Sequence, residues 1–218
     1  MTPKTNGTTK TAILILCVLL FCTALAQAEP ITIQIGGYIT FVGGYDAPES
    51  IQVGSYYTGT YVYNSSTIDS GDGTYQHDAP YGFNISLGGY EFKTAPNHTG
   101  QFIIYIRDDY VVYYGGGQYS DPFDKYSVQS FENASIADGI AIDEIRLGFT
   151  DSSHEALSSS DLPVTTPVLS AWDSKSLEIY GPGNSLSIQG TVTQVTLIPE
   201  PLTCVLLAAG VLFLRYRR

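Results

Sequence analysis

Apolar and polar residues alternate along much of the chain with a period of two, the pattern of a β-strand that buries one face. The alternation is clearest in residues 31–35, where every second residue is isoleucine. Gly36 and Gly37 interrupt it, and a second strand is predicted over residues 38–42. Further strands are predicted over residues 55–63, 83–87, 90–93, 101–107, 110–114, 126–131, 142–149, 177–180 and 186–197.

Many short strands separated by turn residues favour an antiparallel all-β fold. We therefore predict that residues 29–197 form one domain, a jelly-roll-like β-sandwich with its first and last strands in the sheets. Helix is scarce in the pattern, and the best helical candidate in this body is a short turn over residues 153–157.

The last predicted strand contains a break in phase. Ile188 and Val192 share one parity, whereas Val195 and Leu197 share the other. One extra residue near Thr193 and Gln194 would bring both groups to the same face, so a β-bulge is predicted there.

The chain carries a formal net charge of −11, and its charges are unevenly placed. Between Glu29 and Ile198 lie all the acidic residues except Glu200, but only the basic residues Lys93, Arg107, Lys125, Arg146 and Lys175. Affinity for nucleic acid comes from Lys and Arg that neutralise phosphates, so this body is a poor nucleic-acid partner. The cysteines at 17, 22 and 204 all lie in or directly beside the two terminal apolar runs, and the body therefore has no disulfide or thiolate site.

The N-terminus has the three parts of a secretory signal peptide. Lys4 and Lys10 precede an apolar run at residues 12–21, and Ala26 and Ala28 form a small-x-small cleavage site. Residues 1–28 are therefore predicted to be removed on export, so that the mature chain begins at Glu29. The alternatives are an uncleaved membrane anchor and a lipoprotein modified at Cys22, but bulky Phe21 precedes that cysteine where Gly or Ala is normal.

The C-terminal segment, residues 198–218, has three consecutive parts. Pro199, Glu200 and Pro201 come first, an apolar run over residues 202–214 follows, and Arg215, Arg217 and Arg218 close the chain. As a helix the run is about 20 Å long, short of a hydrocarbon core of about 30 Å unless flanking residues help to span it. The predicted membrane anchor includes Leu202, Leu206, Leu207, Gly210, Leu212 and Leu214. By the positive-inside rule, the arginines place the C-terminus in the cytoplasm and the body outside.

This tail resembles the PEP-CTERM sorting signal of Gram-negative bacteria that produce exopolysaccharide. The resemblance implies recognition and processing near Pro199–Pro201 by exosortase, a membrane-embedded peptidase-like partner, and delivery to the cell surface or extracellular matrix. The alternative is a simple C-terminal anchor. Residues 54–63 and 147–163 also look like a pattern that recurs in the bodies of such proteins, whose activity is unknown.

Candidate chemistry in the body is sparse. His77, His98 and His154 are far apart in sequence and are expected to be surface or loop residues. The chain has no nucleophile elbow, P-loop or dinucleotide fingerprint, which favours a non-enzymatic body without a cofactor or metal. Residues 69–73, 108–109 and 143–144 carry carboxylates that calcium could use, but turns and solvated strand ends are the preferred interpretation.

The tyrosines leave two function classes open. Tyrosines 56, 57, 61, 63, 105, 110, 113 and 114 lie in or beside predicted strands, where core packing explains most of them. Exposed tyrosine rings also stack against sugars, so a carbohydrate-binding module for exopolysaccharide is the alternative to a purely structural surface protein. A cluster of at least three exposed tyrosines on one face or rim would favour sugar binding. Trp172, the only tryptophan, is expected in the core.

Overall fold

A computed structural model describes residues 30–199, and within them the fold is antiparallel β throughout. The predicted all-β class is confirmed. The strands are β1 (Pro30–Gly43), β2 (Tyr56–Asn64), β3 (Thr74–His77), β4 (Gly82–Leu87), β5 (Tyr90–Lys93), β6 (Phe102–Tyr110), β7 (Tyr113–Gly115), β8 (Gln118–Tyr119), β9 (Phe123–Ser130), β10 (Glu144–Asp151), β11 (Ser174–Tyr180) and β12 (Ser187–Ile198).

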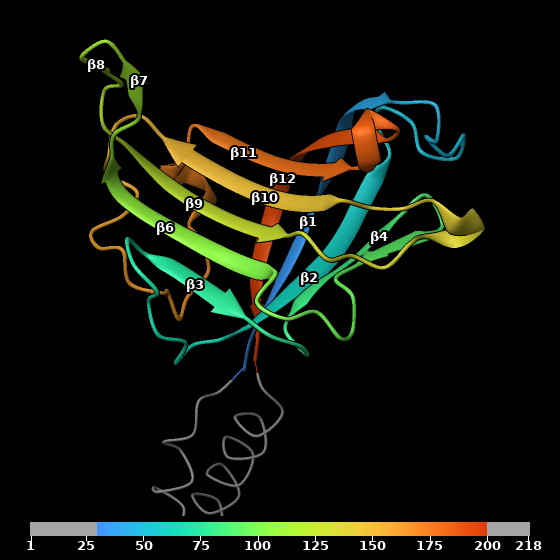
Figure 1. The fold of residues 1–218 in the computed structure, drawn as a ribbon, viewed down its shortest axis with the longest axis horizontal. Coiled ribbons are helices and arrows are strands. Elements are labelled where there is room, and N and C mark those ends of the chain that lie inside the picture. The colour runs from blue at the N-terminus through green and yellow to red at the C-terminus, as the bar shows by residue number, and fades with distance from the viewer. Residues whose placement is uncertain (1–29, 200–218) are drawn as a thin grey trace, which may run out of the picture.

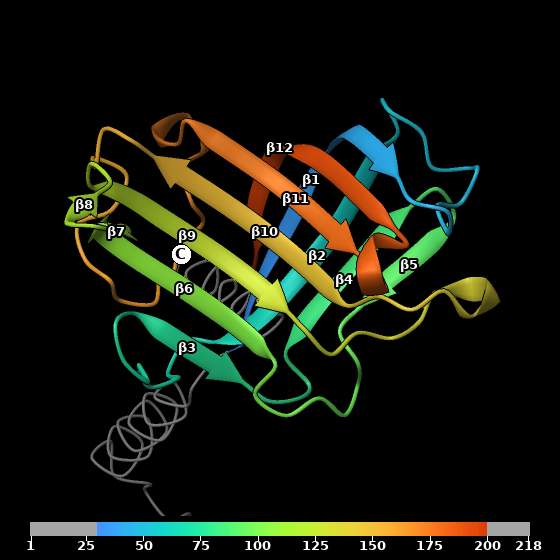
Figure 2. The ribbon, with the colours of Figure 1, turned by 45° about the horizontal axis from the view of Figure 1, so that its top comes forward.

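Ten of these strands form one continuous sheet in the order β3-β6-β9-β10-β11-β12-β1-β2-β4-β5, and β7 pairs with β8 in a separate hairpin. The sheet curls over on itself, so that the half containing β6, β9, β10 and β11 faces the half containing β1, β2 and β4 (Figures 1 and 2). Strand β12 links the halves, because Ser187–Thr191 pairs with β11 while the strand pairs with β1 along its length. The body described here therefore encloses its core with one bent sheet rather than with two separate sheets.

The core fills the space between the two halves. Phe83 of β4 packs edge-on against Phe102 of β6, with ring centroids 5.4 Å apart. Tyr61 of β2 and Tyr126 of β9 share a hydrogen bond of 2.9 Å between their hydroxyls. Trp172 is 4% exposed and contacts the ring of Phe149, which confirms its predicted core position.

The bulge predicted from the phase break is present. Gly36 pairs with Gln194 and Gly37 pairs with Val192, so Thr193 is the extra residue on β12. Thr193 and Gln194 are both exposed, and Val195 returns to the core side, half-buried against the core. Leu197 remains 41% exposed, so the restored inward face ends at Val195.

The two glycines at 36 and 37 do not end a strand, as the sequence suggested, but lie inside the single long strand β1. A Cβ atom on Gly37 would lie 1.9 Å from the carbonyl oxygen of Thr191 and 2.7 Å from the hydroxyl of Tyr57. Glycine therefore lets β12 and Tyr57 approach β1 at the bulge, while pairing with β2 continues without a register shift.

Other sequence predictions need correction. Residues 153–157 form no helix, and the only helical elements in residues 30–199 are the short 3-10 turns η1 (Ala137–Gly139), η2 (Leu169–Ala171) and η3 (Pro182–Asn184). The predicted strand at 110–114 divides, because Tyr110 ends β6 and Tyr113 begins the hairpin. The short strands β3 and β8 were not predicted, since Tyr75 is the only apolar residue of Thr74–His77 and Gln118–Tyr119 is too brief to show a period.

The first and last described residues lie near each other. Thr32 near the start of β1 pairs with Ile198 at the end of β12, and Figure 1 shows both strands reaching the same end of the body. Among residues 30–199, no helix has the length and apolar character needed to cross a membrane.

Candidate functional site

Of the predicted sorting and anchor residues, the structure describes only Pro199, which is exposed and directly follows β12. Ala26, Ala28, Glu200, Pro201, the anchor residues at 202–214 and the arginines at 215, 217 and 218 lie outside the described residues. The described residues therefore bear on the β body alone.

The loop at residues 69–73 is built as a turn. The carboxylate of Asp69 accepts hydrogen bonds from the backbone N–H groups of Gly71 at 2.8 Å, Gly73 at 3.0 Å and Thr74 at 2.8 Å. These bonds, the one from Gly71 first, lower the pKa of Asp69. Both oxygens of Asp69 are engaged by the backbone, which confirms the turn interpretation.

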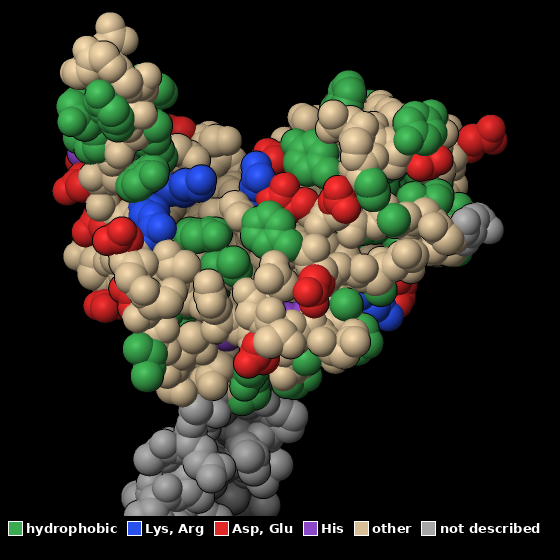
Figure 3. All heavy atoms as spheres, viewed as in Figure 1, with side chains coloured by type: hydrophobic (Ala, Val, Ile, Leu, Met, Phe, Trp, Pro, Cys, Tyr) green, Lys and Arg blue, Asp and Glu red, His purple; other side chains and the backbone are tan. Residues whose placement is uncertain are grey.

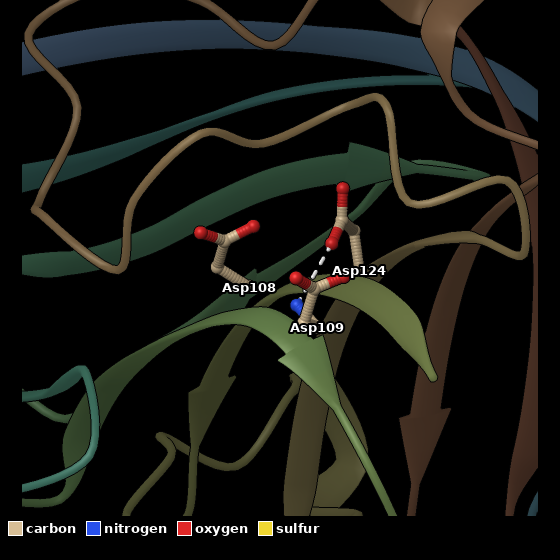
Figure 4. A group of neighbouring side chains, drawn as sticks. All are labelled: Asp108, Asp109 and Asp124. Atoms are coloured by element: carbon tan, nitrogen blue, oxygen red, sulfur yellow. Dashed lines mark hydrogen bonds between the residues drawn. The ribbon is translucent and has the colours of Figure 1, made fainter. Parts of the chain in front are cut away.

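Asp108 and Asp109 meet a third carboxylate that sequence reasoning missed (Figure 4). Ligand oxygens of Asp108, Asp109 and Asp124 all lie within 4.8 Å of one another, so these are the described residues that could hold a divalent cation. Burial, and then the charges of Asp124 and Asp109, raise the pKa of Asp108. The burial of Asp124 could have been predicted from the sequence, because Asp124 lies two and four residues before Tyr126 and Val128 and therefore on the same, core-facing side of the strand.

Asp124 has a structural role that explains its burial. It is fully buried, and its two oxygens accept the backbone N–H groups of Asp109 at 3.1 Å and Leu157 at 2.8 Å. Asp109 in turn lies 3.1 Å from Nδ1 of His154, which is exposed on a loop as expected. The carboxylate of Asp124 thus holds the end of β6 and the loop after β10 against β9.

His98 lies in a loop, as expected, and His77 ends β3, but neither is a surface residue, because each is only 3% exposed. Their rings pack edge-on against Phe102, and Nε2 of His98 lies 2.6 Å from the carbonyl oxygen of Tyr81. Burial lowers the pKa of His77. Both rings belong to the core, where they contact Phe102 and backbone carbonyl groups, whereas His154 contacts Asp109.

The remaining carboxylate pair behaves as a strand end. Asp143 is exposed and Glu144 begins β10, as expected. Glu144 forms an ion pair of 2.6 Å with Arg146, which also pairs with Glu178 of β11 at 3.3 Å.

The tyrosines divide into a buried and an exposed group. Tyr57, Tyr61 and Tyr63 are fully buried on β2, and Tyr126 is buried opposite them. Four of the exposed tyrosines gather at the end of β6 and on the β7–β8 hairpin: Tyr110 is 39% exposed, Tyr113 57%, Tyr114 68% and Tyr119 65%. Exposed tyrosines also occur on β1, after β1 and on β2, at positions 38, 45 and 56. A cluster of at least three exposed tyrosines on one rim favours sugar binding, and the rim at the hairpin has four.

The hairpin projects from the body (Figure 1), and ring pairs lie on it and at its base. The rings of Tyr113 and Tyr119 lie 5.0 Å apart, and the ring of Tyr110 packs edge-on against Phe123 at 5.5 Å. A second pair, Tyr38 and Tyr56, is exposed across β1 and β2 with ring centroids 5.0 Å apart. Figure 3 shows a hollow in the outline between the hairpin and the opposite projection, with basic, acidic and apolar side chains on the surface below it.

A row of side chains on the face of the sheet away from the core runs from this hairpin along strands β6 and β9; most of its members are partly exposed, and Ser127 is fully buried. The cross-strand pairs of this row are Tyr110 with Phe123, Arg107 with Lys125, and Tyr105 with Ser127. We call these six residues the β6–β9 strip. The guanidinium of Arg107 lies 5.5 Å from the ring centroid of Tyr105 and 5.7 Å from that of Tyr110, within cation-π distance of both rings.

Two cavities lie near these elements. One of about 420 Å³ opens beside the strip, with Arg107, Tyr110, Asp108, Asp72 and Ser160 among its lining residues. The other, also about 420 Å³, lies under the loop before β11 and has an apolar lining that includes Trp172, Tyr126 and Leu157. The strip and the first cavity combine aromatic, cationic and carboxylate groups, the mixture expected at a surface that binds a polar ligand.

Comparison of the chain with protein-family models, with curated proteins and with solved structures gives no match.

Proposed function

We propose that the chain is an exported bacterial surface protein, sorted by exosortase through its C-terminal tail, with a non-catalytic β body. The observation that carries the proposal is the tail itself: a Pro-Glu-Pro motif, an apolar run and an arginine cluster in that order. The motif begins at the residue after β12, whose pairing with β1 continues to Ile198. The recognised segment would therefore start where the folded body ends.

Each part of the tail has a separate physical role in this proposal. Proline has no backbone N–H to continue a strand ladder, and it is tolerated in the first turn of a helix. Pro199 and Pro201 would thus separate the sheet from a membrane helix and leave an extended segment for exosortase. The apolar run would hold the chain in the membrane, and the arginines would fix its orientation.

The N-terminal half of the proposal is removal of residues 1–28 as a signal peptide. The first strand begins at Pro30, so cleavage after Ala28 would leave every strand of the sheet intact. We also propose that the curled sheet is a variant of a jelly-roll-like β-sandwich, because its two halves face each other across a shared core. The protein would be anchored through its C-terminal helix before processing and would then reach the cell surface or extracellular matrix.

The experiment changes the parts of the tail separately. With Pro199, Glu200 and Pro201 all replaced by alanine, the chain is expected to be exported and membrane-held but unprocessed, because alanine extends the helix into the recognised segment. With Arg215, Arg217 and Arg218 replaced by glutamine, retention and orientation are expected to weaken instead. Mass and membrane fractionation report both outcomes. Two variants that behave as the unaltered chain does would contradict the proposal.

A second function is favoured by the exposed tyrosines, namely binding of exopolysaccharide by the β body. Tyr110, Tyr113, Tyr114 and Tyr119 expose rings with an apolar face and a polar tip on one projecting rim. Such rings stack on the apolar faces of sugars and hydrogen-bond their hydroxyls. Polysaccharide pull-down with the full chain tests this function. Retention on a polysaccharide resin that is lost when Tyr113 and Tyr119 become alanine is expected, and equal retention of the variant would contradict it.

A further inference from the structure

The β6–β9 strip holds two cations in an otherwise acidic body. Arg107 and Lys125 face each other across neighbouring strands, in direct register. Like charges placed opposite each other on a sheet are destabilising. The described body has few other basic residues, and one of them, Lys93, forms an ion pair with its neighbour Glu91.

Lys125 has no ion pair within residues 30–199. Burial, and then the charges of Arg146 and Arg107, lower its pKa. The one acid that opposes this is Glu178, whose carboxylate is shared with Arg146 at 3.3 Å and the hydroxyl of Tyr180 at 3.1 Å. Lys125 is thus a half-buried cation that is repelled by Arg146 and Arg107. This repulsion lowers the stability of the fold, and a bound anion would reduce the repulsion.

Arg107 also lacks a carboxylate partner within ion-pair distance in the same range of residues. Its Nη2 donates to the hydroxyl oxygen of Thr74 at 3.1 Å, and its buried Nη1 has no hydrogen-bond acceptor. The rings of Tyr105 and Tyr110 both lie within cation-π distance of the guanidinium. The strip therefore alternates aromatic rings with two cations that form no ion pair within residues 30–199. The acid nearest in effect is Asp69, whose pKa is lowered first by the backbone N–H of Gly71 and lastly by the charge of Arg107.

We propose that the β6–β9 strip binds an acidic polysaccharide, with sugar carboxylates at Arg107 and Lys125 and sugar rings against Tyr105 and Tyr110. This inference rests on the proposed glycan binding and names its ligand class. Ser127 and Gln129, on the same face farther along β9, are buried and hydrogen-bond each other at 3.1 Å, so the accessible part of the strip ends at Tyr105, Arg107 and Lys125.

A sugar chain suits this surface better than an acidic polypeptide does. Extended peptides bind by adding a strand to a free sheet edge. Here β6 already pairs with β3 and β9, and β9 pairs with β6 and β10, so neither strand offers an edge. The strip presents side chains only, as stacking against sugar rings requires. Because the rest of the body is acidic, binding should be local and should weaken as salt rises.

The test measures binding of the full chain, solubilised in detergent, to polygalacturonate, dextran and poly-glutamate. We expect polygalacturonate to bind, dextran to bind more weakly and poly-glutamate not to bind. Lys125→Gln should weaken polygalacturonate binding by about tenfold or more, since it removes a partly buried charge contact. The same variant should unfold at the same or a higher temperature, because it removes a repelled cation. Lys93→Gln, on β5 away from the strip, is the matched control and should bind normally.

Tyr110→Ala provides a second variant at an exposed position, and it should weaken polygalacturonate binding without loss of the fold. Equal binding of dextran and polygalacturonate, unaffected by Lys125→Gln and Tyr110→Ala, would overturn this inference and leave glycan binding standing. Binding of poly-glutamate with the same dependence on Lys125 would overturn it in favour of a polypeptide ligand. If the chain binds neither polygalacturonate nor dextran, both the inference and the proposed glycan binding are overturned.

Discussion

Single residues join the two halves of the curled sheet at a few polar points. The hydroxyls of Tyr61 and Tyr126 are fully buried and hydrogen-bond each other, and burial raises the pKa of both. Near the sheet ends, the hydroxyl of Thr94 donates to that of Ser130 at 2.9 Å and accepts the backbone N–H of Phe83 at 2.9 Å. Such bonds contribute little individually, but losing one partner leaves a buried polar group unsatisfied.

This asymmetry predicts a non-additive pair of substitutions. Tyr61→Phe and Tyr126→Phe should each lower the free energy of unfolding by about 1–2 kcal/mol, because each substitution leaves the other buried hydroxyl without its hydrogen-bond partner. The double variant should lose clearly less than the sum. Urea unfolding of the four proteins measures the cycle, and Tyr114→Phe, at an exposed position, serves as the control. Additive losses would mean that the two hydroxyls do not interact in solution.

A glycine at the β12 bulge predicts a steric effect. Gly37→Ala should destabilise the protein by about 1–3 kcal/mol or more, because the new methyl group would meet the backbone of Thr191. Gly148→Ala on β10 is the matched control, since the nearest atom to its Cβ would be the flexible Ser176 hydroxyl at 3.3 Å. Thermal unfolding measures both variants. Equal stability of the two would show that β12 does not approach β1 as closely as described.

The loop after β10 is held by hydrogen bonds to aspartate carboxylates, so the stability of the protein is predicted to fall in acid. Burial alone would raise the pKa of Asp151, but hydrogen bonds from the backbone and hydroxyl of Ser153 and from the backbone N–H groups of Glu155 and Ala156 outweigh it and lower the pKa. These bonds hold the loop after β10 in place of the helix that the sequence suggested. The hydroxyl and backbone N–H of Ser152 likewise lower the pKa of Asp173.

A lowered folded pKa gives stability that is present above the unfolded value of about 4 and is lost as the pH falls through the folded value. Asp151→Asn should therefore be less stable than the unaltered protein near pH 7, and the difference should shrink toward about pH 3. Melting temperatures measured across this range test the prediction. A difference that stays constant with pH would exclude a role for the Asp151 charge.

How far the sequence predicts the elements depends on the length of each pattern. Strands with several alternating residues, such as β4 and β5, and the bulge in β12 follow from local parity. The continuity of β1 through Gly36 and Gly37 does not, because it is decided by pairing with β2 and β12. The burial of His77 and His98 depends on contacts with Phe102, which is distant from His77 in sequence.

At the scale of the whole molecule, the strip illustrates what one sequence cannot reveal. Arg107 and Lys125 belong to strands separated by the β7–β8 hairpin, and only sheet pairing brings them together. The same is true of Asp124 and its two neighbouring aspartates. The all-β class and the division of the tyrosines by parity were open to local reasoning, whereas the curling of one sheet into two facing halves depends on long-range packing.

The arrangement of the termini connects this fold to the proposed sorting route. Strands β1 and β12 are paired neighbours in the sheet, and the described chain enters and leaves the body at one end (Figure 1). A protein held at that end would present the opposite end, with the β7–β8 hairpin and the exposed tyrosines, away from its anchor. The proposed glycan surface and the proposed anchor are thus at different ends of one body.

The most direct test of exosortase sorting is the intact mass of the mature protein, expressed in a host with exosortase and in the same host without it. We expect a chain that begins at Glu29 in both hosts and has lost its tail near Pro199 only where exosortase is present. A chain that keeps its tail through Arg218 in both hosts, or loses it equally in both, would contradict the account.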